Sequence, residues 1–284
     1  MRMKIIFSRK GFDSKAGGFP SLIFPDNQLF SIPIPSNTSH CDYSRLTFKY
    51  EDEPIRNILN QVTKNKIHNG SLYECDYAQA MQGCHHDPML IKESNRLSLG
   101  QAEQAESHLR NQEIASDDIF LFYGWFKRIV LVDGRWMYDH SERDIHLIWS
   151  WMTVGEVIKL DNNNQVNSAL QKFPELNVHP HLMTGWTATP NSIYLSKEHS
   201  LPLFSDTRCL TDMENYTGRS RWRLPSCFNQ PQAFTYLRSF SLEDNDVIIN
   251  FRGYGQEFVL DLDKVSSHTS RQEILQYVDN IRSL

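Results

Sequence analysis

Two long runs of aromatic and β-branched residues constrain the fold of this chain more than any other feature. The first, at 117–132, reads DDIFLFYGWFKRIVLV, and the second, at 144–160, reads DIHLIWSWMTVGEVIKL. This composition favours β-strands, and Gly124 predicts a break in the first run. The segment between the runs, DGRWMYDHSERD, is rich in turn formers. The two runs are therefore expected to pair as antiparallel neighbours.

Shorter segments predict the remaining elements. Strands are predicted at 3–7, 191–197 and 246–262, a hairpin over 17–35, and a loop at 161–165. Apolar residues at helical spacing predict helices at 53–65, 99–112 and 270–284. The chain is thus predicted to be α+β, with a mixed or antiparallel twisted sheet and a few flanking helices. One domain is expected to span 1–284, with the C-terminal helix at 270–284.

Composition and charge exclude several classes of protein. The 284 residues carry a formal net charge of −5, which argues against a protein that coats nucleic acid by charge alone. The five cysteines share no CxxC spacing, so neither a disulfide framework nor a zinc ribbon is indicated. No apolar run approaches the roughly 20 residues of a membrane span. The prediction is a cytoplasmic protein without a structural metal.

The motif SRKGFDS at 8–14 crowds polar groups onto the end of the first predicted strand. Arg9 and Lys10 are of the type that binds phosphate or carboxylate, while Ser8 and Ser14 offer hydroxyl groups. Asp13 could serve as a base or could orient Arg9. We interpret the motif as an anion-binding strand end for a nucleotide-like ligand. A salt-bridged turn is the alternative.

Three further polar segments hold candidate acid–base or ligand residues. GCHHDP at 83–88 places His86 and Asp87 side by side, with a polar loop as the alternative. On the predicted 99–112 helix, spacing puts Gln101 and His108 on the same face as Gln104. His179 and His181 would lie on one side of an extended segment, and whether they bind a metal is open.

Basic and aromatic segments suggest contacts with a nucleic acid. TGRSRWRLP at 217–225 alternates arginines, Arg221 among them, around Trp222, which suits a phosphate backbone and a stacked base. A basic edge strand with a buried tryptophan is the alternative. In the first aromatic run, Tyr123 and Trp125 are candidates for a ligand pocket, although core packing is the more common use of such rings.

Several of these stretches occur together in one known family. KIIFSRKGFDS, GGFPSLIFPD, HHDP, LGQAEQAESHL, DIFLFYGWFK, HPHL and SRWRLP stand in the order typical of the third group of nucleotide modification associated domains. The resemblance covers residues 3 to about 228. It implies a bacterial or phage protein linked to DNA base modification. The polar positions that it carries over are Ser8, Arg9, Lys10, Asp13, Ser14, His86, Asp87, Gln101, His108 and His146.

The chain departs from the family pattern within the second long run. Ser150 and Thr153 stand where the resemblance leads us to expect a glycine and a glutamine. The two long runs are also similar to the paired strands of small PUA-like barrels, which bind modified bases. This second resemblance implies that the sheet contains a PUA-like barrel.

Three functions are compatible with these features, and the least favoured of them is hydrolysis at a histidine metal site. The first is an enzyme of transferase, glycosidic or hydrolytic type that acts on a base or nucleotide, with Asp13, His86, Asp87 and His108 as catalytic candidates. In it, Arg9, Asp13, Asp87 and His108 are predicted to share one pocket. The second is a non-catalytic reader of a modified base in an aromatic pocket. In the first two, the partner is a nucleotide or a nucleic acid, bound through a single-stranded or flipped base. No particular cofactor is indicated.

Overall fold

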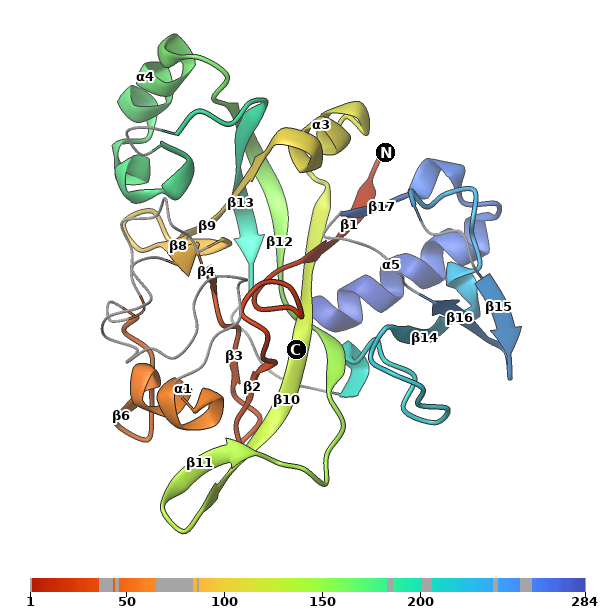
Figure 1. Cartoon of the computed structure of the whole chain (residues 1–284). Helices are drawn as coiled ribbons and strands as arrows, with labels where there is room; N and C mark the ends of the chain where they lie inside the picture. Colours follow the sequence, from red (N-terminus) through yellow and green to blue (C-terminus); the bar gives the residue numbers. More distant parts are fainter. Residues whose placement is uncertain are drawn as a thin grey trace. The chain divides into compact units, whose positions relative to one another are not determined.

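The strand predicted at the start of the chain lies inside a mixed sheet (Figure 1). This strand, β1, runs Lys4–Arg9 and pairs parallel with β10, Ile119–Val132, and antiparallel with β17, Phe258–Asp261. The computed structural model describes residues 2–35, 43, 46–64, 84–85, 87–182, 186–200, 206–236, 240–250 and 257–283. The mixed sheet, with helices in addition, confirms the predicted α+β class.

The chain divides into two units by its internal contacts. Unit 1 comprises Met1–Arg9, Pro88–Tyr123 and Ile145–Leu284, and unit 2 comprises Lys10–Asp87 and Gly124–Asp144. Strand β10 contributes to both units, and it runs through Gly124 without the predicted break. A Cβ atom at Gly124 would lie 2.7 Å from the Lys10 carbonyl oxygen. The glycine therefore permits a close backbone approach within unit 2 and does not end the strand. The single domain over 1–284 stays a prediction.

The sheet of unit 1 has the strand order β17-β1-β10-β12-β13-β9-β8. Its further strands are β8 Met89–Ile91, β9 Arg96–Ala102, β12 Ile145–Lys159 and β13 Asn191–His199. The two long predicted runs are neighbours in it, as β10 and β12. Although three strands separate β1 from β9, Ser8 and Gln101 both donate to the Glu257 carboxylate, so the sheet must curl. A PUA-like barrel stays a prediction.

The two faces of this sheet bury different sets of side chains, because successive residues of a strand point to opposite sides. Ile5 and Phe7 of β1 belong to one core cluster, which also contains residues of α5, His268–Arg282. Ile6 lies in the other cluster, with Phe120, Tyr194 and Leu109. Ser8 continues the second face, which is therefore the inner face of the curl. Figure 1 shows α5 next to a second, three-stranded sheet of β14 Arg221–Pro225, β16 Asp246–Asn250 and β15 Phe240–Glu243.

The predicted 99–112 helix is shorter than expected. Helix α3 runs Glu103–Asn111, and residues 99–102 belong to β9, where Gln101 pairs with Ser192. Gly100 explains part of the error, since a Cβ atom there would lie 2.3 Å from the His181 ring. Pairing with β13 overrides the helix propensity of this segment. Gln101 thus lies on a strand and His108 on a helix, so the prediction that they share one helix face was wrong.

Two other predicted boundaries also differ from the structure. The predicted loop at 161–165 contains the start of helix α4, Asn163–Lys172, because the Asn162 side chain caps it by accepting from the Gln165 backbone N–H at 3.1 Å. The segment around His179 and His181, which would place both side chains on one side only if it were extended, forms the 3₁₀ turns Pro174–Val178 and Pro180–Leu182. Prolines at the start of both turns favour this tighter geometry.

Unit 2 is built on a hairpin that the sequence predicts. Its strands are β2 Ser21–Ile23, β3 Leu29–Phe30, β4 Ile34–Pro35, β5 Lys49–Tyr50, β6 Glu53–Pro54, β7 Cys84–His85 and β11 Arg135–Tyr138, and its helix is α1, Ile55–Thr63. β2 and β3 pair antiparallel around the predicted turn, and β2 also pairs parallel with β10. Phe24 stacks on Tyr50 at 4.1 Å and packs edge-on against Trp136, so aromatic rings form much of this core.

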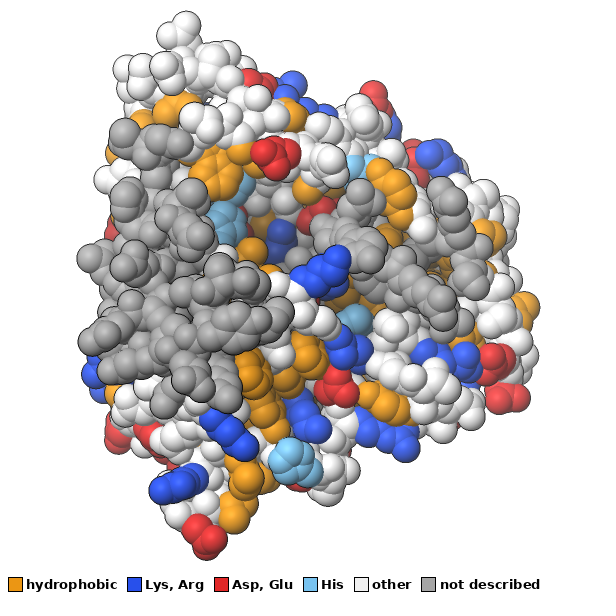
Figure 2. All heavy atoms as spheres, in the orientation of Figure 1, with side chains coloured by type: hydrophobic (Ala, Val, Ile, Leu, Met, Phe, Trp, Pro, Cys, Tyr) orange, Lys and Arg blue, Asp and Glu red, His pale blue; other side chains and the backbone are white. Residues whose placement is uncertain are grey.

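The visible surface carries both signs of charge. In Figure 2, Lys and Arg side chains lie interspersed with Asp, Glu and uncharged side chains. This mixture of signs agrees with the net charge of −5. Among the described helices, none has the length and apolar character needed to cross a membrane.

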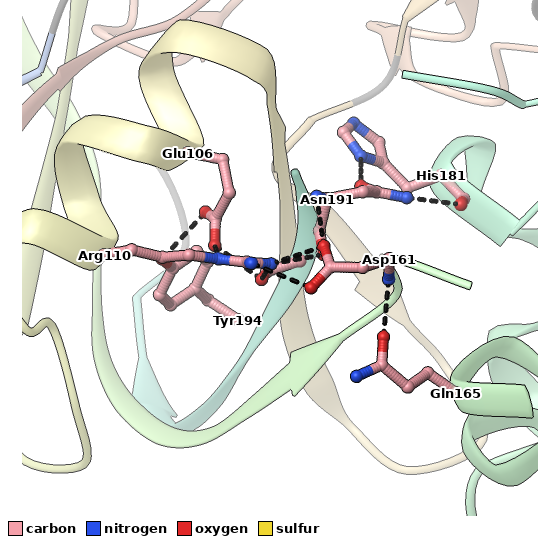
Figure 3. Close-up of polar contacts among 8 residues, drawn as sticks. Glu106, Arg110, Asp161, Gln165, His181, Asn191 and Tyr194 are labelled. Atoms are coloured by element: carbon pink, nitrogen blue, oxygen red, sulfur yellow. Dashed lines mark hydrogen bonds and ion pairs between the residues drawn. The ribbon is translucent and has the colours of Figure 1, made fainter. Parts of the chain in front are cut away.

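A buried polar network fixes α3 on the sheet of unit 1 (Figure 3). Arg110 forms a two-point ion pair with Asp161, at 2.8 Å for each bond, and donates to Glu106 at 2.7 Å. Glu106 is fully buried and also accepts from Tyr194 and Ser192 of β13. The bond to Arg110 lowers the pKa of Asp161. Because these bonds join α3 to β13 and to the end of β12, they set the position of His108.

Replacing Arg110 with Ala should destabilise the protein by about 3–5 kcal/mol, because the fully buried Glu106 would lose its charged partner. Lys172→Ala is the matched control. It removes the exposed ion pair with Glu156 and a contact of the ammonium group with the Phe173 ring, and should cost about 0–1 kcal/mol. Chemical unfolding of both variants measures the difference. Equal losses would mean that the network does not hold α3.

Candidate functional site

A buried carboxylate lies at the centre of the polar cluster on the inner face of the unit 1 sheet. Glu257 directly precedes β17 and is 2% exposed. Its Oε1 accepts from Ser8 Oγ at 3.1 Å and from Gln101 Nε2 at 2.6 Å. Removing a carboxylate from water is costly unless hydrogen bonds replace the lost hydration. Ser8 and Gln101, both buried, supply two of those bonds.

His108 approaches this carboxylate from α3. The residue is 8% exposed, and its Nε2 lies 3.2 Å from Thr235 Oγ1. The Val259 backbone N–H donates to the same Thr235 oxygen, which fixes the Thr235 side chain beside the imidazole. The Tyr236 ring packs on the imidazole with a centroid distance of 4.6 Å. These contacts fix the imidazole ring beside Glu257.

Burial controls the protonation of His108. Burial lowers its pKa below the ordinary 6.5, although the Glu257 charge and a hydrogen bond to the Glu257 backbone act in the opposite direction. His108 is therefore neutral at pH 7 and can accept a proton. The proton would then be stabilised by the neighbouring carboxylate. A neutral imidazole next to a buried carboxylate is an arrangement suited to general acid–base chemistry.

The structure brings three predicted residues together and adds others. Ser8, Gln101 and His108 meet around Glu257, which the sequence analysis missed, as it also missed Thr235 and Tyr236. The available signal was an acidic residue directly before the apolar strand 258–261. That signal alone does not say which distant groups the carboxylate contacts.

A second group of predicted residues lies in the aromatic core on the other face. Tyr123 is fully buried, and its ring packs edge-on against Trp222 at 5.0 Å and His146 at 5.6 Å. The Trp222 indole N–H donates to His146 Nδ1 at 3.0 Å. His146 therefore accepts at Nδ1 and packs as part of this core. Ligand binding by Tyr123 and His146 stays a prediction.

The SRKGFDS motif is divided in the structure. Strand alternation directs Arg9 to the face opposite Ser8, while Lys10, Asp13 and Ser14 belong to unit 2. There, the Asp13 carboxylate accepts from the Lys15 and Ala16 backbone N–H groups, at 2.6 and 2.7 Å. Asp13 thus caps a tight loop, whatever else it does.

The HHDP segment is described only in part. His86 lies outside the described residues. His85 Nε2 lies 2.8 Å from Asp87 Oδ2, within ion-pair distance. Trp125, also in unit 2, donates from its indole nitrogen to Asp144 at 2.6 Å. The catalytic roles of Asp13, His86 and Asp87 stay predictions. So does the pocket shared by Arg9, Asp13, Asp87 and His108, since Asp13 and Asp87 belong to unit 2 and the other two to unit 1.

Arg221 lies on β14, at an edge of the three-stranded sheet. It forms ion pairs with Asp212 at 2.8 Å and Glu243 at 2.5 Å, and the neighbouring Arg223 pairs with Asp212 and Asp246. Trp222 between them is 1% exposed. These contacts agree with the alternative of a basic edge strand around a buried tryptophan. Nucleic-acid binding by Arg221 stays a prediction.

His179 and His181 are buried next to the network of Figure 3. Asn191 Nδ2 donates to the His181 carbonyl oxygen, so Asn191 Oδ1 faces His181 Nδ1 as an acceptor at 2.6 Å. His181 therefore carries its proton on Nδ1, and its Nε2 has the lone pair that a metal would need. His179 Nδ1 accepts from the His181 backbone N–H. The absence of a structural metal stays a prediction.

The fold and this cluster define an α+β protein with an acid–base cluster on the inner face of a curled sheet. A family model described as nucleotide modification associated domain 3 matches residues 4–261, so the chain belongs to that family. The match includes Glu257 and β17, beyond the residues up to about 228 that carry the resemblance. Neither the curated proteins nor the solved structures compared with the chain include a match.

The depressed pKa of His108 predicts a stability loss in acid. The unfolded chain, with a histidine pKa of 6.5, binds the proton more readily than the folded one, so folding weakens as pH falls below 6.5. His108→Gln should reduce this loss between about pH 7.5 and about pH 5.5 in urea unfolding. Burial also lowers the pKa of His199, so His199 contributes a separate part of the stability loss. His199→Gln is the comparison variant that measures this part. An unchanged pH slope in His108→Gln would contradict the assignment.

Proposed function

We propose that this chain is an enzyme that acts on a base or nucleotide, with His108 and Glu257 as its acid–base pair. The observation that carries the proposal is the buried cluster in which Glu257 accepts from Ser8 and Gln101 while Thr235 and Tyr236 hold the nearby His108 ring. Structural histidines are common, but this one has a depressed pKa, an acidic neighbour and a fixed ring, which together characterise many catalytic sites. Membership of a family associated with nucleotide modification supports a nucleotide or base as the substrate.

In this proposal His108 removes a proton from the attacking group, either a water molecule or a hydroxyl of the acceptor. The imidazolium that forms is stabilised by the nearby Glu257 charge. His108 then returns the proton to the leaving group, so that the chemistry is transfer or hydrolysis. Ser8 and Gln101 act as positioning residues, because they hold the Glu257 carboxylate and do not exchange protons themselves.

The proposed ligand is a single nucleotide or an unpaired base, and not a continuous duplex. The net charge of −5 and the mixed charges in Figure 2 oppose strong unspecific binding to DNA. The SRKGFDS motif predicts that Arg9 and Lys10 bind an anion, and we keep this as a separate proposal. Arg9 lies on the face of β1 opposite Ser8, and Lys10 belongs to unit 2, so neither is assigned to the His108 cluster. Lys10 contributes a point charge, whereas Arg9 can form two parallel bonds.

The alternative is a non-catalytic reader with an aromatic pocket of Tyr123 and Trp125. Tyr123 already packs between His146 and Trp222, and Trp125 is bonded to Asp144. Using either ring as a ligand cage would require these contacts to be rearranged. Because both rings already have these partners, we prefer the enzyme to the reader.

Glu257→Gln and His108→Gln test the proposal directly. Each should lower turnover by about 10²–10⁴-fold, the usual contribution of general acid–base catalysis. The probes are the four deoxynucleoside monophosphates and a single-stranded oligonucleotide with and without modified bases, with products detected by mass spectrometry. His199→Gln controls for removal of a partly buried histidine elsewhere in unit 1. Binding without any product would support the reader, and no binding of any probe would overturn both functions.

The phosphate contact is tested by Arg9→Ala. It should weaken mononucleotide binding by about 1.5–3 kcal/mol, the usual contribution of a hydrogen bond to a charged group. Arg221→Ala is the control, because its ion pairs already neutralise the side chain. It should leave mononucleotide affinity nearly unchanged in calorimetric titration. Equal losses in both variants would mean that SRKGFDS is not an anion-binding motif.

A further inference from the structure

Tyr236 has an unusual backbone conformation for so large a residue. Its φ is +62°, in the left-handed region that favours glycine and asparagine, and the residue is 50% exposed. A bulky side chain in this region is strained, and such strain persists only where neighbouring contacts hold it. Strained residues of this kind concentrate at ligand sites.

The contacts of Tyr236 and of the residue before it are directed at the proposed catalytic pair. Thr235 is held by its own backbone N–H, which donates to Val259 at 2.9 Å, and by its hydroxyl group between Val259 and His108. With Thr235 fixed, the Tyr236 ring packs on the His108 imidazole at 4.6 Å, with 52° between the planes. Half of the Tyr236 surface is still exposed to solvent. An aromatic ring is thus held at the edge of a buried acid–base site.

We propose that Tyr236 is the stacking platform for the base of the substrate, an inference that rests on the proposed function. The exposed part of a tyrosine ring offers a flat π surface, which attracts any nucleobase regardless of its hydrogen-bonding edge. The two rings are in contact, so a base stacked on the exposed side of Tyr236 would lie at the edge of the His108 site, with the Tyr236 ring between the base and the imidazole. The phosphate group, which has no π face, gains nothing from this ring.

The platform also defines the class of substrate. Stacking on a side chain requires that the base leave its own stack, so a paired base inside a duplex is not accepted. Because the contact reads the face of the base and not its edge, Tyr236 confers selection for unpaired bases and little selection among them. Discrimination between bases must then come from other residues of the site.

The test uses the monophosphate of 2-aminopurine deoxyriboside, whose fluorescence is quenched when the base stacks on an aromatic ring. Wild type and Tyr236→Phe should quench and bind it equally. Tyr236→Leu and Tyr236→Gly should abolish the quenching and weaken binding by about 5- to 150-fold. Glycine tolerates the positive φ that leucine does not, so Tyr236→Gly should melt at a higher temperature than Tyr236→Leu. Loss of binding in both variants then reports the ring and not misfolding.

The outcomes separate this inference from the function on which it rests. If wild type binds the probe and Glu257→Gln or His108→Gln alters turnover, but Tyr236→Leu and Tyr236→Gly bind as wild type does, the platform is refuted and the enzyme proposal stands. If wild type binds neither the probe nor a natural mononucleotide, the proposed function fails and the platform fails with it. Weaker binding in Tyr236→Leu but not in Tyr236→Gly would assign the effect to backbone strain and would also refute the platform.

Discussion

The carboxylate of Glu257 is the constraint on which the unit 1 architecture depends. It accepts from residues 249 and 156 positions away in the chain, Ser8 and Gln101, while it is 2% exposed. A carboxylate in such a place costs several kcal/mol in lost hydration, which only well-placed donors offset. The two donors lie on strands with three others between them, so satisfying the carboxylate requires a curled sheet. The same requirement brings the end of β1, the end of β9 and the start of β17 to one point.

The position of His108 beside that carboxylate depends on a second buried acid. Glu106, two residues earlier on α3, is held by Arg110 from its own helix and by Ser192 and Tyr194 from β13. Burial and the charges of Glu106 and Glu257 raise the pKa of Tyr194, so its hydroxyl group stays protonated and donates. The helix therefore cannot slide along the sheet without breaking a charged bond. This restraint turns a surface helix into a fixed support for an imidazole ring.

The sequence predicts the strands well because their apolar residues are contiguous. It points to Ser8 because polar groups crowd the end of the first strand, and to Gln101 and His108 because of their spacing on an expected helix. It assigns Gln101 to the wrong element, since helix-forming composition at 99–102 does not reveal the β13 partner or the His181 ring over Gly100. The start of α4 was readable, as Asn162 is a standard helix cap. Glu257 and Tyr236 were not. The role of Glu257 depends on the curl of the sheet. The positive φ of Tyr236 occurs at a residue that is neither glycine nor asparagine, so the sequence does not predict it.

The charge of the site limits how a nucleotide can enter it. In the proposed complex, a phosphate placed about 4 Å from Glu257 would be opposed by roughly 4 kcal/mol at an effective dielectric constant near 20. The base is neutral and suffers no such penalty, so the base end of the nucleotide must be the end next to Glu257 and His108. That orientation agrees with an aromatic ring, Tyr236, as the contact nearest the imidazole. It also requires that the phosphate be bound by positive charges away from the carboxylate.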